Sequence, residues 1–413
     1  MPTFVERTPR LFDSSNLSPF GDLVTSEQIP LLQFDFVYGI LNQSGNTAAT
    51  GTGAVVDTNL ARLRAQSGIT PTTGTALFTS VKPARYKAGE GITARFTTVF
   101  GSPKAGNVQE IGAGTTENGY FYGFNGTSFG ILYRNSSSGS LVETWIPQTD
   151  WNGDKADGTG ASLFNWNPFF GNVCMIRYAF LGFGDVNFFV QDSLSGRFIL
   201  VHTIRYANSS ANVQLSNPTL GFWVRCANTG GNTSNVTLYV GSVGFFMNGL
   251  REYTNGRFSA DSAKSGVTTE TNILTIKNAT TFNGITNKGV VKLESVSFGG
   301  NVNGVNPSGY ALLKIKKDVT LGGTPNFTPI SGTTSNNGAT ITNGQSLASI
   351  DIAGTTITGG VPYFSISANM NNGYQVDLSP YNIFILPTET ITVSIYCSNS
   401  ALAFASFNWV EDI

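Results

Sequence analysis

Charged side chains are scarce in this sequence. Lys, Arg, Asp and Glu make up 12% of its 413 residues, and the formal net charge is −1. That share is about half of the usual value of roughly 25%. Disordered chains combine a high net charge with low hydrophobicity, whereas 40% of this chain is hydrophobic, so we expect a folded core. A nearly neutral chain exerts no long-range attraction on phosphates, and we expect no nucleic-acid partner.

Histidine and cysteine are also rare. The single histidine, His202, lies in an alternating run typical of a strand, whereas nucleophilic triads and most metal sites rely on histidine. The three cysteines, Cys174, Cys226 and Cys397, are far apart, and their spacing neither matches a metal site nor implies a disulfide. We therefore predict no catalytic residues, no cofactor and no metal ligands.

Acidic residues do not form a catalytic pattern. A sandwich-type glycosidase would place two or three acids close together along one strand, but no strand carries acids at i, i+2 and i+4, and Glu143 stands alone. Asp150, Asp154 and Asp157 fall in one loop at loose intervals. Ordinary turn chemistry is the favoured interpretation, while calcium binding stays open because carboxylates are its usual ligands.

Long apolar runs are absent, and the N-terminal region is polar. No stretch of 18 apolar residues exists, so we predict no contact with a membrane and no secretion signal. Four prolines break any helix in residues 1–30. We interpret these residues as an extended arm that docks on a neighbouring subunit through short apolar anchors, namely Phe4, Leu11, Phe12 and Phe20.

Apolar side chains repeat every second residue through most of the chain. Leu32, Phe34 and Phe36 share one face of a predicted strand, and Asn125-Gly126 joins two further alternating segments as a hairpin turn. We predict an all-β protein with the extended arm at residues 1–30, a sandwich at 31–250, a charged linker at 251–270 and a second, smaller sandwich at 271–413. The last two strands are predicted to pair as a hairpin, with Trp409 filling the second core.

Aromatic residues gather in one part of the predicted first sandwich. Two interpretations fit them: they fill a large core, which is the favoured one, or they line a glycan site beside Asn and Asp neighbours. The candidates for glycan binding are Trp145, Trp151, Trp166, Tyr120 and Tyr122.

Short motifs in residues 31–250 resemble the concanavalin/laminin-G-like jelly-roll sandwich of tailed-phage virion proteins. They occupy residues 76–80, 85–91, 94–97, 119–123, 177–178, 181–184 and 202–208, and the start at 18–39 is similar to the arm and first strand of such proteins. The C-terminal part resembles generic phage β-sandwich modules. The resemblance implies location in a virion and recognition of sugars.

These observations favour a non-enzymatic virion structural protein, such as a capsid decoration, fibre or tail-fibre component. It would act through contacts with other virion proteins and assemble as a homo-oligomer, with a trimer among the options. The alternative is an adhesin that binds host glycans at the particle surface. A glycan hydrolase ranks last, because it needs two carboxyl groups in one cleft.

Overall fold

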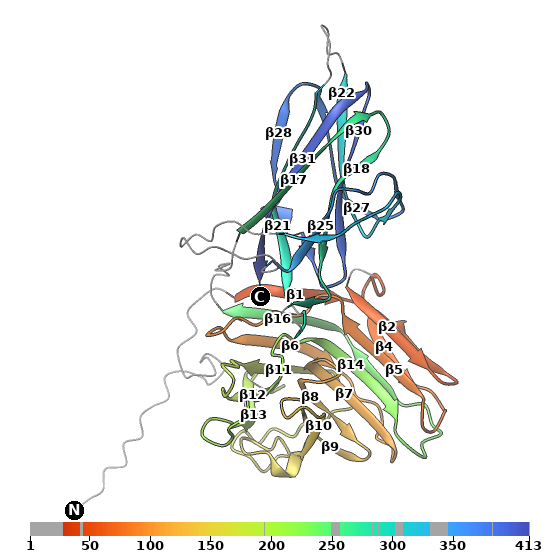
Figure 1. The fold of residues 1–413 in the computed structure, drawn as a ribbon. Helices are drawn as coiled ribbons and strands as arrows, with labels where there is room; N and C mark the ends of the chain where they lie inside the picture. The colour runs from red at the N-terminus through yellow and green to blue at the C-terminus, as the bar shows by residue number, and fades with distance from the viewer. Residues whose placement is uncertain are drawn as a thin grey trace, which may run out of the picture. The chain divides into compact units, whose positions relative to one another are not determined.

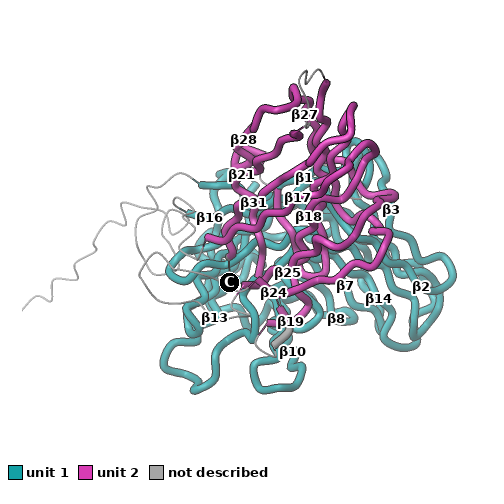
Figure 2. The backbone as a smooth tube through the Cα atoms, turned by 45° about the horizontal axis from the view of Figure 1, so that its top comes forward, with its two compact units in different colours: residues 1–251 teal, residues 252–413 magenta. Residues whose placement is uncertain are grey.

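A computed structural model of the chain describes residues 28–41, 44–193, 195–248, 257–282, 285–287, 289–301, 309–330, 346–381 and 383–412. Within these ranges the secondary structure consists of antiparallel strands and short 3₁₀ helices, η2 (Gln148–Asp150) and η3 (Ser379–Tyr381). The chain divides into two compact units, Met1–Arg251 and Glu252–Ile413, which Figure 2 shows in different colours. The prediction of an all-β fold with two sandwiches is confirmed.

The first unit is a sandwich of two large sheets (Figure 1). One sheet has the order β1 (Gln28–Asp35), β16 (Ser242–Asn248), β6 (Ile92–Thr98), β11 (Asn172–Tyr178), β12 (Val186–Gln191) and β13 (Phe198–Ile204). The other has the order β10 (Val142–Pro147), β9 (Ser128–Asn135), β8 (Gly119–Asn125), β7 (Asn107–Gly114), β14 (Gly221–Asn228), β5 (Thr75–Ser80) and β2 (Gly45–Thr50). A smaller sheet contains β15 (Thr237–Val240), β4 (Arg62–Ser67) and β3 (Ala54–Asn59).

The core of the first unit follows from the alternation of side chains along the strands. In β8, Tyr120, Tyr122 and Phe124 join the core cluster, while the intervening Phe121 belongs to a separate cluster on the other face of the seven-stranded sheet. We call that second face the outer face. Strand β8 continues into β9 through the predicted Asn125-Gly126 turn, where Gly126 has a φ of 61°.

The second unit is also a two-sheet sandwich around its own core. One sheet contains β17 (Arg257–Val267), β31 (Ala401–Asp412), β21 (Val290–Asn301) and β28 (Gly373–Asp377), with β29 (Phe384–Ile385) also paired to β21. The other contains β24 (Thr328–Pro329), β25 (Ala348–Asp351), β18 (Thr271–Asn278), β30 (Thr390–Cys397), β22 (Tyr310–Lys317) and β27 (Val361–Asn369). Two-residue strands form the pairs β19 (Thr281–Phe282) with β20 (Ile285–Thr286), and β23 (Thr320–Leu321) with β26 (Ile357–Thr358).

Two sequence predictions for the second unit are wrong. The expected linker at 251–270 contains β17, whose alternating small and charged residues form an edge strand that pairs with β31. The last two strands do not form a hairpin: β30 pairs with β18 and β22, whereas β31 pairs with β17 and β21. The turn between them carries the chain from one sheet to the other. Trp409 does fill the core, where it is fully buried.

The predicted docking arm lies outside the described residues, except for residues 28–30, which begin β1. Its anchors Phe4, Leu11, Phe12 and Phe20 therefore stay predictions. Across the described ranges, no helix is long and apolar enough to cross a bilayer.

Candidate functional site

Four of the five aromatic residues proposed for glycan binding lie in the core. Tyr120 and Tyr122 are fully buried, and Trp151 and Trp166 are only 3% and 5% exposed. The rings pack on one another, with 5.4 Å between the ring centres of Tyr122 and Trp166. Because neighbouring side chains cover their faces, these rings cannot stack on a sugar. For these four residues the glycan-binding alternative is wrong, and the favoured core-filling interpretation holds.

Trp145 is placed differently. It belongs to β10, the edge strand of the seven-stranded sheet, where it lies opposite Leu132 of β9. Its partly exposed ring packs against a small apolar cluster on the outer face, formed by Phe121, Leu132 and Trp223. Of the five predicted aromatic residues, Trp145 thus marks the candidate site.

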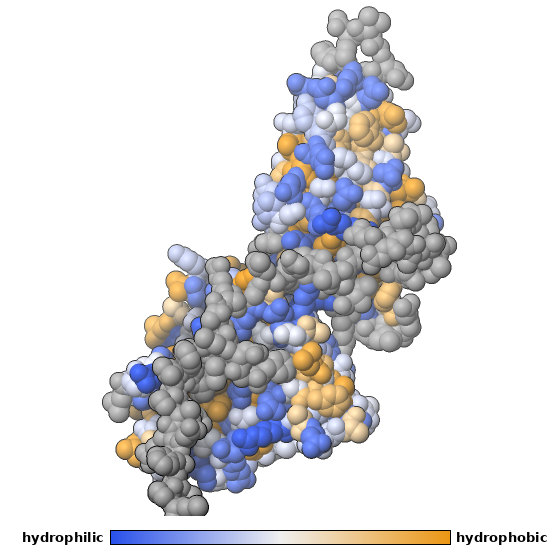
Figure 3. Space-filling view, turned by 90° about the vertical axis from the view of Figure 1, so that its left-hand side faces the viewer, coloured by the Kyte–Doolittle hydropathy of each residue, from blue (hydrophilic) through white to orange (hydrophobic). Residues whose placement is uncertain are grey.

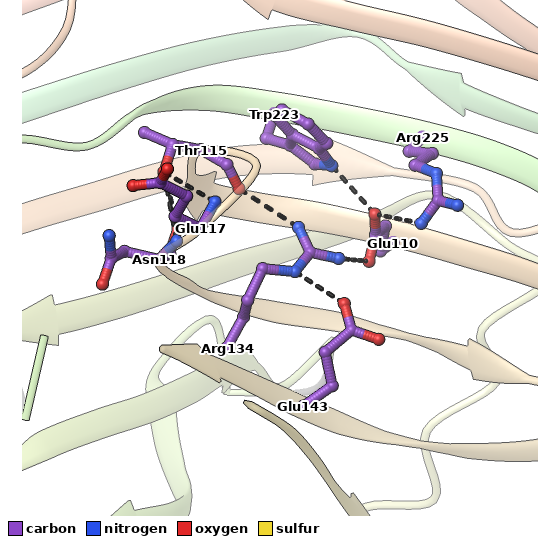
Figure 4. Close-up of polar contacts among 8 residues, drawn as sticks. All are labelled: Glu110, Thr115, Glu117, Asn118, Arg134, Glu143, Trp223 and Arg225. Carbon is purple, nitrogen blue, oxygen red and sulfur yellow. Dashed lines mark hydrogen bonds and ion pairs between the residues drawn. The ribbon is translucent and has the colours of Figure 1, made fainter. Parts of the chain in front are cut away.

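A network of charged side chains lies beside this cluster on the outer face (Figure 4). Glu110 comes from β7 and Arg134 from β9, so β8 lies between them. Gly123 of β8 lies opposite Glu110, and a Cβ atom there would come within 1.9 Å of the carbonyl oxygen of Gln109. Gly123 thus allows β7 and β8 to approach closely, and the Arg134 side chain extends across β8 to Glu110.

Arg134 holds both carboxylates of the network. Its Nη2 donates to Glu110 Oε2 at 2.8 Å, and its Nε donates to Glu143 Oε1 at 2.7 Å. Its Nη1 donates to the carbonyl oxygen of Thr115 at 3.2 Å. The guanidinium carbon also lies 4.8 Å from the ring centre of Phe121 and 5.5 Å from that of Trp223. Such cation–π contacts help to hold the guanidinium flat against the face.

Glu110 is a fully buried carboxylate with several donors around it. Besides the bond from Arg134, its Oε1 accepts hydrogen bonds from Trp223 Nε1 at 3.0 Å and from Arg225 Nη1 at 3.1 Å. Buried charges persist in proteins when they are paired and hydrogen-bonded in this way. The two arginines and two glutamates balance in charge, so the network presents no net charge.

The electrostatics keep Arg134 ionised. Burial by itself lowers the pKa of the Arg134 guanidinium, but the nearby Glu110 and Glu143 carboxylates and their hydrogen bonds outweigh it and raise that pKa above its ordinary value. Three donors, from Arg134, Trp223 and Arg225, already occupy the oxygens of Glu110. The network therefore holds the four side chains in fixed positions on the outer face.

The other polar groups singled out in the sequence serve the structure of the first unit. The Nδ1 atom of His202 accepts a hydrogen bond from the backbone N–H of Asn152 at 3.3 Å. The Asp154 carboxylate accepts from the backbone N–H groups of Ala156 and Ser162, which shapes the loop. Within the described ranges, no three His, Cys, Asp or Glu residues gather in a way that could hold a metal ion.

No protein-family model matches the chain, and no curated protein matches it. Several solved structures align with about half of it. A glycosyl hydrolase family 16 protein from Mycobacterium smegmatis shows 13% identity, covers 52% of this chain and 100% of its own, and gives a TM-score of 0.36. Arcelin-5, a lectin-like defence protein from Phaseolus vulgaris, shows 12% identity, covers 53% and 99%, and gives 0.32.

Lectin II from Ulex europaeus also shows 12% identity, covers 53% of this chain and 100% of its own, and gives a TM-score of 0.34. At these identities and scores the alignments say nothing about activity or ligand. The three proteins are lectin-like or hydrolytic, and none comes from a virus. The resemblance to virion proteins therefore stays a prediction.

Replacing Arg134 tests the buried network. In Arg134→Gln, the buried Glu110 carboxylate loses its main partner, and we expect the free energy of unfolding to fall by about 3–5 kcal/mol. Glu143→Gln is the matched control, because the Glu143 side chain is 39% exposed and its pair with Arg134 should contribute less than about 1 kcal/mol. Urea denaturation measures both. Equal losses in the two variants would contradict a buried, interdependent network.

The pH dependence of stability tests the environment of His202. Burial, with Arg205 nearby, lowers the pKa of His202 from 6.5 to about 4. Between these values the unfolded chain binds a proton that the folded chain does not, so stability should fall as the pH drops from 6.5 to 4. This loss should reach about 3 kcal/mol. The variant His202→Gln should lack this part of the loss in urea titrations, and an unchanged pH profile would contradict the assignment.

Proposed function

We propose that this protein is a non-catalytic carbohydrate-binding protein and that a saccharide binds on the outer face of the seven-stranded sheet, beside Trp145. The observation that carries the proposal is the Arg134 network, which fixes polar groups next to a partly exposed tryptophan ring. Ligand sites combine apolar and aromatic surface with a few polar groups held in place. Glu143 and Arg225 supply the accessible polar groups, since their side chains are 39% and 30% exposed.

The same network favours binding over hydrolysis. Glycosidases need one protonated and one ionised carboxyl group on either side of the scissile bond. Here a single guanidinium engages both Glu110 and Glu143, and Glu110 is closed to substrate because it is fully buried. The arrangement supplies an oriented acceptor and donor at Glu143 and Arg225, but no acid in position to protonate a leaving group.

Glycan binding by single variants tests this function. In Trp145→Ala the sugar loses its stacking surface, and we expect at least tenfold weaker binding to whichever glycan the wild-type protein selects on an array. Phe170→Ala is the control, because Phe170 is an aromatic residue of the same unit that is 69% exposed and lies in the loop before β11, a strand of the other sheet.

Two results would contradict the proposal. One is an array on which the full chain binds no glycan. The other is release of reducing sugar from a bound glycan that stops in Glu143→Gln, since that would make the protein a hydrolase. Circular dichroism of each variant checks that the fold is kept.

A structural role in a virus particle is the second candidate. Some large apolar side chains of the first unit are strongly exposed: Tyr38 by 89%, Leu60 by 83% and Leu163 by 76%. Figure 3 shows apolar side chains between polar ones on the surfaces of both units. Such side chains favour contacts with other subunits, including other copies of this chain. An adhesin at the particle surface would satisfy both candidates.

Mass spectrometry of purified particles tests the structural role, and we expect this chain among their proteins. Analytical ultracentrifugation of the isolated protein should show a homo-oligomer, with a trimer among the states compatible with this role. Purified particles that lack the chain, together with a monomeric protein at micromolar concentration, would remove this candidate and leave the carbohydrate-binding proposal standing.

A further inference from the structure

The second unit contains a pocket that plays no part in the proposed site on the first. Its volume is about 440 Å³, and it lies on strands β22 and β27. The lining side chains are two cations, two aromatic rings, a proline ring and a hydroxyl group: Lys314, Lys316, Pro362, Tyr363, Phe364 and Ser365. Such a combination can recognise a ligand that is both ring-shaped and charged.

The lysines of this pocket carry more positive charge than their partner neutralises. Lys314 Nζ lies 3.0 Å from Glu270 Oε2, and Lys316 Nζ lies 2.8 Å from Glu270 Oε1. Two ammonium groups thus share one carboxylate, which leaves one positive charge. Ser394 donates a further hydrogen bond to Glu270. The neighbouring Lys317 does not add to this charge, because it pairs with Glu389.

Both lysine side chains are held by Glu270 and are partly exposed. The side chains of Lys314 and Lys316 are 32% and 18% exposed. Burial raises the pKa of Glu270, but its hydrogen bonds to Lys316, Lys314 and Ser394 outweigh this and lower the pKa, so the carboxylate stays ionised. Two cations fixed about one anion are preorganised to accept a second anion.

A β-bulge positions the aromatic part of the pocket. Ile315 pairs with Phe364 and Lys316 pairs with Pro362, so Tyr363 is an extra residue on β27. Bulges re-aim side chains at the edges of sheets, and β27 is an edge strand. Tyr363 is 42% exposed, and Pro362 beside it is exposed as well. They offer an apolar surface next to the lysines.

We propose that this pocket binds an acidic saccharide. Its sugar ring packs on Pro362 and Tyr363, and its carboxylate accepts hydrogen bonds from the ammonium groups of Lys314 and Lys316. The hydroxyl group of Ser365 is available to a sugar hydroxyl. The site belongs to the second unit alone, and its existence does not depend on the saccharide site proposed on the first unit.

Titration calorimetry of the full chain with a trisaccharide of galacturonic acid tests this site. The methyl ester of the same trisaccharide is the matched neutral probe. We expect the acid to bind at least tenfold more tightly than the ester. The double variant Lys314→Gln/Lys316→Gln should lose at least tenfold in affinity for the acid, while Lys277→Gln, a lysine of the same sheet outside the pocket lining, should lose less than twofold.

The variant Glu270→Gln is expected to gain affinity, and a variant that fails to fold would lose it. Loss of the negative charge leaves two uncompensated lysines in place of one, and the amide oxygen that replaces the carboxylate can still accept a hydrogen bond from them, so this variant should bind the acid several-fold more tightly than the wild-type protein. Tyr363→Ala should weaken binding, whereas Tyr310→Ala, an exposed tyrosine of β22 outside the pocket lining, should not.

Three outcomes would overturn the proposal. Equal affinity for the acid and its ester would exclude a carboxylate-specific site. An equal loss in Lys277→Gln and in the double lysine variant would indicate diffuse attraction of anions. Full competition by equimolar sodium acetate would show that the pocket recognises a carboxylate without the sugar. Trp145→Ala should leave this binding unchanged, which separates the site from the one proposed on the first unit.

Discussion

Side-chain alternation in the seven-stranded sheet is the constraint on which the first unit depends. Strand β7 is buried at every one of its eight residues, and β8 is buried at all but its last. Ile111 and Tyr122 point into the sandwich core, whereas Glu110 and Phe121 point to the outer face. The sheet therefore buries different kinds of side chain on its two faces. Apolar contacts between the sheets stabilise the fold, and an ionic and aromatic network orders the opposite face.

Two networks among the described residues each join one charged side chain to two of opposite charge. Arg134 holds two carboxylates in the first unit, and Glu270 holds two lysines in the second. Burial makes each unpaired charge expensive, so these groups tolerate little rearrangement. Both networks lie beside partly exposed aromatic rings, Trp145 and Tyr363. That juxtaposition of fixed charge and ring is the common feature of the two proposed sites.

The arrangement of carboxylates bears on whether such a sandwich binds or cleaves a sugar. In a hydrolase the paired acids must differ in protonation, which requires environments that separate their pKa values. In this chain Arg134 donates a hydrogen bond to each of Glu110 and Glu143, so one guanidinium occupies an oxygen of both carboxylates. The proposed saccharide site thus contains carboxylates, as a hydrolase site does, and it differs in the hydrogen-bond partner of each carboxylate.

Local regularities in the sequence were enough to predict the class of fold. Alternation of apolar residues predicts strands, Asn125-Gly126 predicts a tight turn, and the large apolar Trp409 predicts a core position. These features act over a few residues, so they can be read without knowing the neighbours in space. Alternation also explains why Tyr120 and Tyr122 were candidates for a glycan site although they lie in the core. It shows that Tyr120 and Tyr122 share a face, but it does not tell which face a second sheet will cover.

Only the tertiary structure decided which residues meet. Glu110 contacts Arg134 across 24 residues of sequence and Trp223 across 113. These contacts depend on strand order and register, which place β7 between β8 and β14. Likewise β30 and β31 follow each other in sequence but lie in different sheets, because each completes the hydrogen bonding of partners far away in the chain. The sequence by itself therefore determined an all-β chain of two sandwiches. The pairing of its strands decided where charge and aromatic rings come together.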